Sequence, residues 1–214
     1  MDLYGRRREY MPPRPLEIAH LDPDPLVTLS GWIDEAYRAG EPEPGQMILA
    51  TVDGDGQPQA RAVLLRAIHE GALHFYTNRE SAKARDLAAR PRAAATFGWP
   101  ALLRQVRVTG PVSELSGADS DAYFASRPRE SQLGAWASPQ SEVIVSREAL
   151  DERLAEVERR FAGGEVPRPP FWGGYAVLAV SVEFWQGRPG RLHDRLRWRR
   201  AAPQEPWTLE RLAP

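Results

Sequence analysis

Short apolar runs separated by tight-turn residues are the feature that most restricts the fold of this chain. Residues 47–52 and 59–66 form two such runs, and Asp-Gly-Asp-Gly stands between them at 53–56. Gly and Asp tolerate the backbone angles of a two-strand turn, so this pattern predicts a β-hairpin. Further strands are predicted at residues 71–77, 93–99, 105–115, 175–185, 192–199 and 207–212, with a bulge or corner at Gly110-Pro111.

Four helices are predicted, one before the first strand and three between later strands. Asp24-Pro25 is typical of a helix start, and Gly40 is typical of its end. The other predicted helices cover residues 81–90, 118–126 and 146–161. Strands joined by hairpins, with a few peripheral helices, favour a mainly β fold that is a closed or split antiparallel barrel. A parallel doubly wound sheet would need a regular strand-helix-strand alternation, which the sequence lacks.

The length and charge of the chain limit its organisation and its partners. At 214 residues it fits one medium domain, which we assign to residues 24–214. Residues 1–23 are rich in Arg and Pro, and we predict that they form a mobile N-terminal arm. The 28 basic and 29 acidic residues leave a net charge of -1. With this charge balance the protein has no overall positive potential that would attract nucleic acid or an anionic membrane. Any anion-binding site must therefore arise from a local group of basic residues.

Several classes of chemistry are disfavoured. The chain has no cysteine, which excludes a thiol nucleophile or a thiolate metal site, and its four histidines show no metal-ligand spacing. Nucleophile-elbow, Walker and dinucleotide-binding motifs are also missing. The first twenty residues contain no apolar run, so we expect no signal peptide and no membrane span, and predict a cytoplasmic protein.

The C-terminal stretch 184–195 holds the first candidate site. A Gly- and Pro-rich turn at 187–190 precedes the predicted strand 192–199. Side chains two positions apart in an extended chain share a face, so Arg191, His193 and Arg195 are predicted to point the same way. Two guanidiniums beside one imidazole would form an anion-binding surface with a titratable group. The alternative is an ordinary solvated strand face.

Lys83 is the only lysine, and the other 27 basic residues are arginine. It lies in the first turn of the predicted helix 81–90, where free backbone N–H groups favour phosphate, although a solvent-facing helix residue is the alternative. Arg61 and Arg66 differ by an odd number, so a regular strand would place them on opposite faces. Either only one of them meets a given ligand, or the strand ends or bulges between them.

Two further groups could bind a phosphorylated ring. The Gln105 amide on a strand could both donate to and accept from a heterocycle. Tyr123, Arg127 and Ser131 recur at spacings of four, so a phenol, a guanidinium and a hydroxyl could hold one phosphate. Helix-end chemistry is the alternative explanation for that trio. The seven tryptophans suit an aromatic, phosphorylated cofactor.

Blocks of sequence spread in order over nearly the full length resemble pyridoxamine/pyridoxine 5'-phosphate oxidase. They cover residues 7–10, 57–66, 75–78, 104–106, 126–132, 171–174, 183–187, 191–195 and 211–214. The resemblance implies an FMN-binding split β-barrel and a homodimer with two flavins at its interface. It also implies oxidation of pyridoxine or pyridoxamine 5'-phosphate by O2 to pyridoxal 5'-phosphate and H2O2, with ammonia from the amine.

The same resemblance implies a set of site residues. The FMN contacts would be Arg61, Ala62, Val63, Leu64, Leu65, Arg66, Tyr76, Thr77, Lys83, Gln105, Gln140, Ser141, Trp185 and Arg195. The substrate contacts would be Arg66, Tyr123, Arg127, Ser131, Arg191, Leu192 and His193, with Arg7, Arg8, Glu9 and Tyr10 folding over the site. Arg191 and His193 would be catalytic, either by orienting the ring or by assisting proton removal.

Two positions depart from the family pattern. Arg66 stands where relatives usually carry lysine, and Ala82 stands where they usually carry arginine. The resemblance therefore implies one flavin-phosphate contact fewer, with Lys83 carrying more of that charge. Two rival functions are a related flavin oxidase acting on a phenazine-type ring and a non-enzymatic module that binds flavin or pyridoxal phosphate. The first disagrees with the intact Tyr123, Arg127 and Ser131 trio, and the second predicts binding without oxygen consumption.

Overall fold

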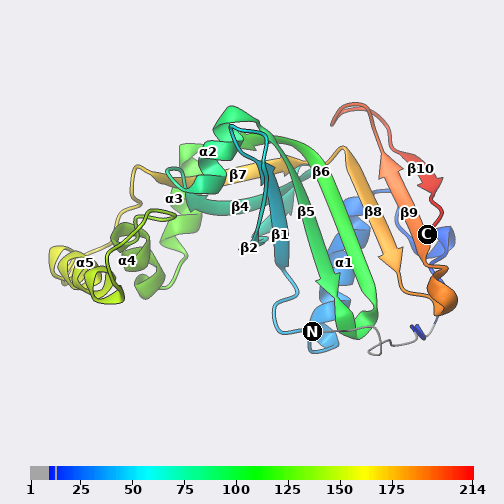
Figure 1. Ribbon diagram of the computed structural model, residues 1–214, viewed down its shortest axis with the longest axis horizontal. Helices are drawn as coiled ribbons and strands as arrows, with labels where there is room; N and C mark the ends of the chain where they lie inside the picture. Colours follow the sequence, from blue (N-terminus) through cyan, green and yellow to red (C-terminus); the bar gives the residue numbers. More distant parts are fainter. Residues whose placement is uncertain (1–9, 13) are drawn as a thin grey trace.

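The computed structural model describes residues 10–12 and 14–214, whose strands form one curled antiparallel sheet (Figure 1). The sheet follows the order β10-β9-β8-β6-β5-β1-β2, while β7 joins β6 to β4, which also pairs with β3. The strands are β1 Gln46–Val52, β2 Pro58–Leu64, β3 Ala67–His69, β4 Ala72–Asn78, β5 Arg92–Trp99, β6 Arg104–Glu114, β7 Trp172–Leu178, β8 Ser181–Gln186, β9 Asp194–Arg199 and β10 Thr208–Arg211. The predicted mainly β, antiparallel split-barrel fold is confirmed.

Helices lie around this sheet. The α-helices of the described residues are α1 Pro25–Arg38, α2 Ala82–Ala89, α3 Gly117–Ala125, α4 Arg129–Ala137 and α5 Arg147–Arg160, and 3-10 turns cover Ile18–His20, Pro100–Leu102 and Pro189–Arg191. Asp24 caps α1 as predicted, because its carboxylate accepts the Leu26 N–H at 2.9 Å. The sequence did not predict α4, which begins directly after Pro128 and contains Gly134. No helix of the described residues is long and apolar enough to cross a membrane.

A corner in the sheet forms where β6 changes its partner. Residues 104–109 of β6 pair with β8, whereas residues 112–114 pair with β7. The single strand predicted at 175–185 is therefore wrong, because the chain breaks between Leu178 and Ser181 to reach both partners. A Cβ at Gly110 would lie 1.7 Å from the Leu178 carbonyl oxygen. The corner predicted at Gly110-Pro111 thus exists, and β6 passes through it without interruption.

The main core lies between α1 and the sheet. Trp32 of α1 packs edge-on against Phe184 of β8, with ring centroids 4.9 Å apart, and against Trp99 of β5 at 6.3 Å. A second, smaller cluster centres on Phe124 of α3 and Trp172 of β7, with Leu133 of α4. This second cluster forms the base of the region between α3, α4 and the sheet.

Leu16 of the predicted arm lies against the C-terminal strands β9 and β10. Leu16 is buried, and its N–H donates to the Asp194 carboxylate at 3.1 Å. Arg211 of β10 also contacts the Leu16 carbonyl, with its Nη2 at 3.5 Å. These contacts attach residues near the N-terminus to strands near the C-terminus.

The close backbone contact at the corner gives the first prediction. We expect Gly110→Ala to lower the free energy of unfolding by at least about 2 kcal/mol, because the new methyl group meets a rigid carbonyl. Urea unfolding followed by circular dichroism measures this.

The matched control is Gly31→Ala on α1. Nothing lies within 4 Å of a Cβ at that position. There the change should raise the unfolding free energy by about 0.5 to 1 kcal/mol, because alanine favours the helix. A Gly110→Ala protein as stable as Gly31→Ala would contradict the importance of this corner.

Candidate functional site

A cleft of about 460 Å³ lies where β2 and β4 meet α2, α3 and α4. It is lined by Ala62, Val63, Leu64, Arg66, Tyr76, Thr77, Asn78, Lys83, Tyr123, Arg127, Ser131, Gly134, Ala135, Ser138, Gln140 and Trp172. The structure therefore brings together the predicted strand 59–66, the predicted lysine and the predicted trio at 123, 127 and 131. No three His, Asp or Glu side chains of the described chain are grouped to hold a metal ion.

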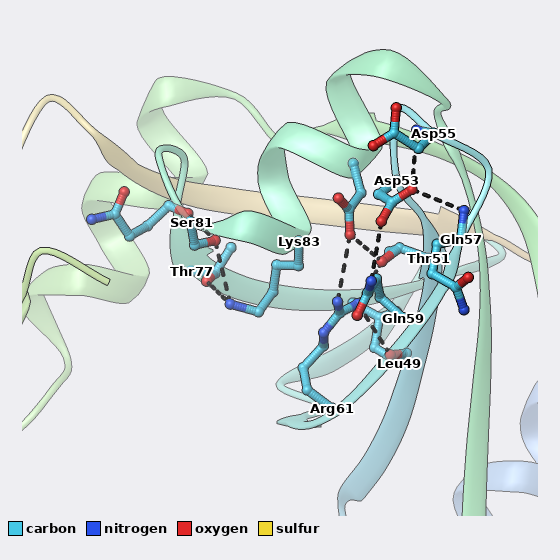
Figure 2. A network of polar contacts seen from close by, with 12 residues as sticks. Leu49, Thr51, Asp53, Asp55, Gln57, Gln59, Arg61, Thr77, Ser81 and Lys83 are labelled. Atoms are coloured by element: carbon cyan, nitrogen blue, oxygen red, sulfur yellow. Dashed lines mark hydrogen bonds and ion pairs between the residues drawn. The ribbon is translucent and has the colours of Figure 1, made fainter. Parts of the chain in front are cut away.

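Lys83 occupies the first turn of α2, at one end of the cleft. Its ammonium lies 3.2 Å from the Thr77 hydroxyl and 3.3 Å from the Ser81 hydroxyl (Figure 2). The residue is only 8% exposed. Burial, followed by the charge of Arg61, lowers the pKa of Lys83 to about 8, while Asp86 opposes the change. A buried ammonium held by two hydroxyls and no carboxylate is suited to an anionic ligand.

Gln140 joins the loop after α4 to this end of the cleft. Its Oε1 accepts the Thr77 hydroxyl at 2.9 Å and the Asn78 N–H at 3.3 Å. Its neighbour Ser141 is exposed and adopts a positive φ of 74°. Ser141 does not line the cleft.

The other end of the cleft is built around Arg127. Its Nη1 is buried without a hydrogen-bond partner. Burial lowers the pKa of Arg127, and nearby Arg66 lowers it further while Tyr123 opposes them. The guanidinium carbon lies 4.8 Å from the centre of the Trp172 ring. A buried guanidinium N–H without a hydrogen-bond acceptor is unfavourable. The geometry is therefore suited to an anionic ligand that accepts a hydrogen bond from Nη1.

An aromatic stack forms the wall beside Arg127. Tyr76 and Tyr123 stack with ring centroids 4.0 Å apart, and Tyr76 also stacks on Trp172 at 5.5 Å. Sequence reasoning assigned no site role to Trp172, and nor did it to Asn78, Gly134, Ala135 or Ser138. Asn78 ends β4 opposite Trp172 of β7, and the unpredicted helix α4 and the residue after it bring Gly134, Ala135 and Ser138 to the cleft.

Arg61 and Arg66 have different surroundings. β2 ends at Leu64, and only Arg66 lines the cleft. Arg61 instead donates to the Thr51 hydroxyl at 2.5 Å and lies 3.4 Å from the Asp86 carboxylate (Figure 2). Its neighbour Leu65 packs against the main core and is not among the cleft residues.

The C-terminal candidates gather at a different place. His193 contacts Trp185, with ring centroids 4.6 Å apart, and Tyr10 lies 5.7 Å from His193 and 6.0 Å from Trp185. The predicted shared strand face for Arg191 and His193 is wrong, because Arg191 lies in a 3-10 turn with a φ of 61° and β9 begins only at Asp194. Leu192 is 73% exposed.

Three predicted residues form one row across neighbouring strands. Gln105 of β6 is opposite Trp185 of β8, which is opposite Arg195 of β9. Arg195 donates to the Glu183 carboxylate and to the Ala213 carbonyl, both at 2.8 Å. None of this row lines the cleft. Figure 1 shows β8 and β9 at the opposite end of the molecule from α3 and α4.

His193 has a defined hydrogen bond. Its Nδ1 accepts the Arg188 N–H at 3.0 Å, so the neutral ring carries its proton on Nε2. Burial and then Arg191 lower the pKa of His193, which favours this neutral form. Arg7, Arg8 and Glu9 of the predicted substrate arm lie outside the described residues.

Comparisons with known proteins place this geometry in a family. A family model described as pyridoxamine 5'-phosphate oxidase matches residues 33–161. The chain belongs to the pyridoxamine 5'-phosphate oxidase family. A second model, the pyridoxine 5'-phosphate oxidase C-terminal dimerisation region, matches residues 172–214 and therefore β7 to β10.

Relatives and solved structures agree with this membership. The chain is 54% identical over 213 residues to a pyridoxine/pyridoxamine 5'-phosphate oxidase of Rubrobacter xylanophilus, covering 100% of this chain and 97% of that protein. It is 52% identical to the Salinibacter ruber oxidase of the same name, covering 91% of each. PhzG of Burkholderia lata, solved with tetrahydrophenazine-1-carboxylic acid, has a TM-score of 0.84 at 30% identity, covering 90% of this chain and 94% of that one.

The buried ammonium of Lys83 gives the second prediction. An unfolded lysine has a pKa of about 10.4, whereas that of folded Lys83 is about 8. Between these values the unfolded chain binds more protons, so the unfolding free energy should rise as the pH rises from about 8. Lys83→Met should remove this rise and stabilise the ligand-free protein at pH 7 by on the order of 2 kcal/mol.

Urea unfolding between pH 6 and pH 9 measures both effects, because tyrosines, with a pKa of about 10, titrate mainly above this range. The matched control is Arg85→Met on the same helix, because the Arg85 side chain is exposed and pairs with Glu142. It should leave the pH dependence unchanged. A stability profile that keeps its rise in Lys83→Met would show that another group titrates.

Proposed function

We propose that the protein is an FMN-dependent oxidase that converts pyridoxine 5'-phosphate or pyridoxamine 5'-phosphate to pyridoxal 5'-phosphate with O2. One observation carries the proposal: a single cleft holds two separate cationic ends, Lys83 and Arg127, with stacked aromatic rings beside Arg127. Two phosphorylated rings need two such ends. Sequence identity of 54% to a relative named for this activity supports the same reading.

The donor set of the cleft fits both ligands. Lys83, Thr77 and Gln140 would hold FMN at the α2 end, where the ammonium has hydroxyl neighbours and no paired carboxylate. Arg127, Tyr123 and Ser131 would hold the substrate phosphate, and the unpaired Nη1 of Arg127 would gain its missing acceptor. Arg66 adds a second guanidinium at this end. Ala82 adds no charge to α2, so Lys83 carries the FMN phosphate on that helix.

The reaction balances with oxygen as the oxidant. The alcohol and O2 give the aldehyde and H2O2, and the amine, O2 and water give the aldehyde, ammonia and H2O2. When bound, FMN supplies the ring that accepts the hydride and passes the electrons to O2. The chain supplies fixed positive charge at each phosphate and an apolar, aromatic wall that excludes water from the reacting carbon.

The C-terminal set would complete the site from a second copy of the chain. In one chain, Trp185, His193 and Arg195 lie on β8 and β9 or between them, away from the cleft. The dimerisation region spans this segment. We infer a homodimer in which Gln105, Trp185 and Arg195 of one subunit face the FMN held by the other.

Arg191 and His193 would then act on the substrate ring. Because Nδ1 of His193 accepts the Arg188 N–H, its free nitrogen presents an N–H donor. His193 therefore orients the ring by donating a hydrogen bond and is a poor proton acceptor. Arg191, in its exposed turn, would add positive charge beside it.

The direct test measures flavin and turnover together. The purified protein should show the absorbance of bound FMN, and it should consume O2 and release H2O2 when pyridoxine 5'-phosphate or pyridoxamine 5'-phosphate is added. A reduced phenazine carboxylic acid tests the rival oxidase suggested by the structural similarity to PhzG. Turnover of the phenazine alone would replace the proposal, and FMN binding without any turnover would indicate a binding module.

Subunit complementation tests the shared site. Arg127→Met should raise the KM for the phosphorylated substrate by about 100-fold while FMN is retained, because charged hydrogen bonds to phosphate are lost. Arg191→Met should depress turnover more than FMN retention. If each site takes Arg127 from one subunit and Arg191 from the other, mixing the two variants creates heterodimers with one intact site. Activity at low substrate should return to about a quarter of wild type after random exchange.

The control mixes Arg127→Met with Arg147→Met. Arg147 lies on α5, where it pairs with the exposed Asp151. In this mixture every heterodimer keeps Arg127 in one of its two sites. The mixture therefore measures how much activity one working site contributes to a heterodimer. No recovery in the Arg127 and Arg191 mixture, with subunit exchange verified by mass spectrometry, would place both residues in the same subunit's site.

A further inference from the structure

A buried carboxylate lies on β8, on the face of the sheet opposite to the main core. Val182 and Phe184 are part of that core, so the residue between them, Glu183, points to the other face. Glu183 is nevertheless only 7% exposed. A buried carboxylate is unfavourable unless it is paired and hydrogen-bonded, so its partners explain why it is tolerated at this position.

Arg195 of β9 is the main partner of Glu183. Oε1 of Glu183 lies 2.8 Å from both Nε and Nη2 of Arg195. Arg107 of β6 is more distant, because its Nη1 lies 3.4 Å from Oε2 of Glu183, and its side chain is 48% exposed. The short, charge-assisted contact of the carboxylate is therefore the one with Arg195.

The direct cross-strand neighbour of Glu183 is a different arginine. In the pairing of β8 with β9, Glu183 is opposite Arg197, whereas Arg195 is opposite Trp185. Arg197, however, donates from Nε and Nη2 to the carboxylate of Glu210 on β10, at 3.0 Å and 2.6 Å. Glu183 thus pairs with its diagonal neighbour Arg195, and each of the two arginines has a carboxylate of its own.

The C-terminal segment holds the same guanidinium at a second point. Nη1 of Arg195 donates to the Ala213 carbonyl at 2.8 Å, and the Leu212 N–H donates to the Arg195 carbonyl at 3.0 Å. The contacts with Glu183 and Ala213 use one N–H each of Nε, Nη1 and Nη2. Because Nη1 and Nη2 each carry two N–H groups, the second N–H of each remains for a ligand.

We propose that Glu183 is a positioning residue for Arg195: together with the Ala213 carbonyl it fixes the plane and direction of the guanidinium that would contact FMN. A long side chain that is fixed before binding loses less conformational entropy when the ligand binds. That the ligand is FMN rests on the proposed function, whereas the effect of Glu183 on the position of Arg195 does not.

The dissociation constant of FMN tests the proposal through the direction of its change. Glu183→Gln keeps the shape and an acceptor oxygen but removes the charge that pairs with Arg195. If Glu183 acted only through its charge, the change would strengthen the binding of anionic FMN, because a nearby negative group is removed. If Glu183 positions Arg195, FMN binding should weaken by about tenfold. Titration of the flavin-free protein with FMN, followed by flavin fluorescence, measures this.

Arg195→Met provides the second arm of the experiment. In that background Glu183→Gln should cause no further weakening, because the group that Glu183 positions is gone. The matched control is Glu210→Gln, which removes the carboxylate from Arg197 and should leave FMN binding unchanged. An unchanged or lower dissociation constant in Glu183→Gln, or equal weakening with and without Arg195, overturns the proposal.

A measurement on the ligand-free protein separates this proposal from the proposed function. The Nε–H of Arg195 gives a ¹⁵N signal that is identified by its loss in Arg195→Met. Its exchange with solvent should be about tenfold faster in Glu183→Gln and unchanged in Glu210→Gln, because the Glu183 carboxylate accepts this N–H. A wild-type protein that binds no FMN defeats the proposed function. The exchange rate then decides the role of Glu183, and an unchanged rate in Glu183→Gln overturns it.

Glu183→Asp replaces Glu183→Gln if the latter does not fold. It keeps the charge but retracts the carboxylate from Arg195 by one methylene. A role of charge alone predicts unchanged FMN binding and unchanged Nε–H exchange, whereas the positioning role predicts weaker binding and faster exchange. Unchanged values of both quantities in Glu183→Asp would overturn the proposal.

Discussion

The backbone contact between Gly110 and Leu178 is the constraint on which the rest of the structure depends. At this point β6 leaves β8 and begins to pair with β7, so one continuous strand belongs to both halves of the curled sheet. Because a side chain at residue 110 would overlap the Leu178 carbonyl, the turn from β7 into β8 can approach β6 closely only at a glycine. The cleft lies on one side of this corner and the C-terminal row of Gln105 and Trp185 on the other.

The cleft itself is built from positive charge that the chain leaves without full compensation. Lys83 has hydroxyl neighbours, and Arg127 keeps a buried Nη1 without a partner. Both arrangements lower the stability of the ligand-free protein, since a buried cation is stable only when it is paired. Under the proposed function, the two phosphates supply the missing anions, so binding and folding stability are linked.

The sequence predicted the parts of the fold that local chemistry decides. The Asp24 cap of α1 and the Asp-Gly hairpin between β1 and β2 depend on neighbouring residues, and both are found. Errors arise where distant segments decide the structure. The apolar run at 175–185 looks like one strand, and its pattern does not show that β6 pairs with β8 and then with β7. Pro128 directly precedes α4, which the local sequence does not predict.

For the site, the spacing of four grouped Tyr123, Arg127 and Ser131, and all three line the cleft. They do not share one helix, because α3 ends at Ala125 and Ser131 belongs to α4. The spacing could not find Trp172. Trp172 reaches the cleft through the pairing of β7 with β4. The family resemblance supplied residue identities, and the structure supplied their grouping.

The cleft and the C-terminal set lie at separate places in one chain, and this separation restricts how a complete site can be assembled. Arg195 donates to the Glu183 carboxylate and to the Ala213 carbonyl, and Trp185 contacts Tyr10 and His193, so contacts within the chain fix the position of the C-terminal set. A set that is already folded in place cannot swing across the sheet to its own cleft without breaking β8 and β9. Under the proposed function, one chain carries two half-sites, the cleft and the C-terminal set, at separate places in the fold. Two copies related by a twofold axis can join each cleft to the other copy's C-terminal set, and symmetry then produces two equivalent sites from one interface.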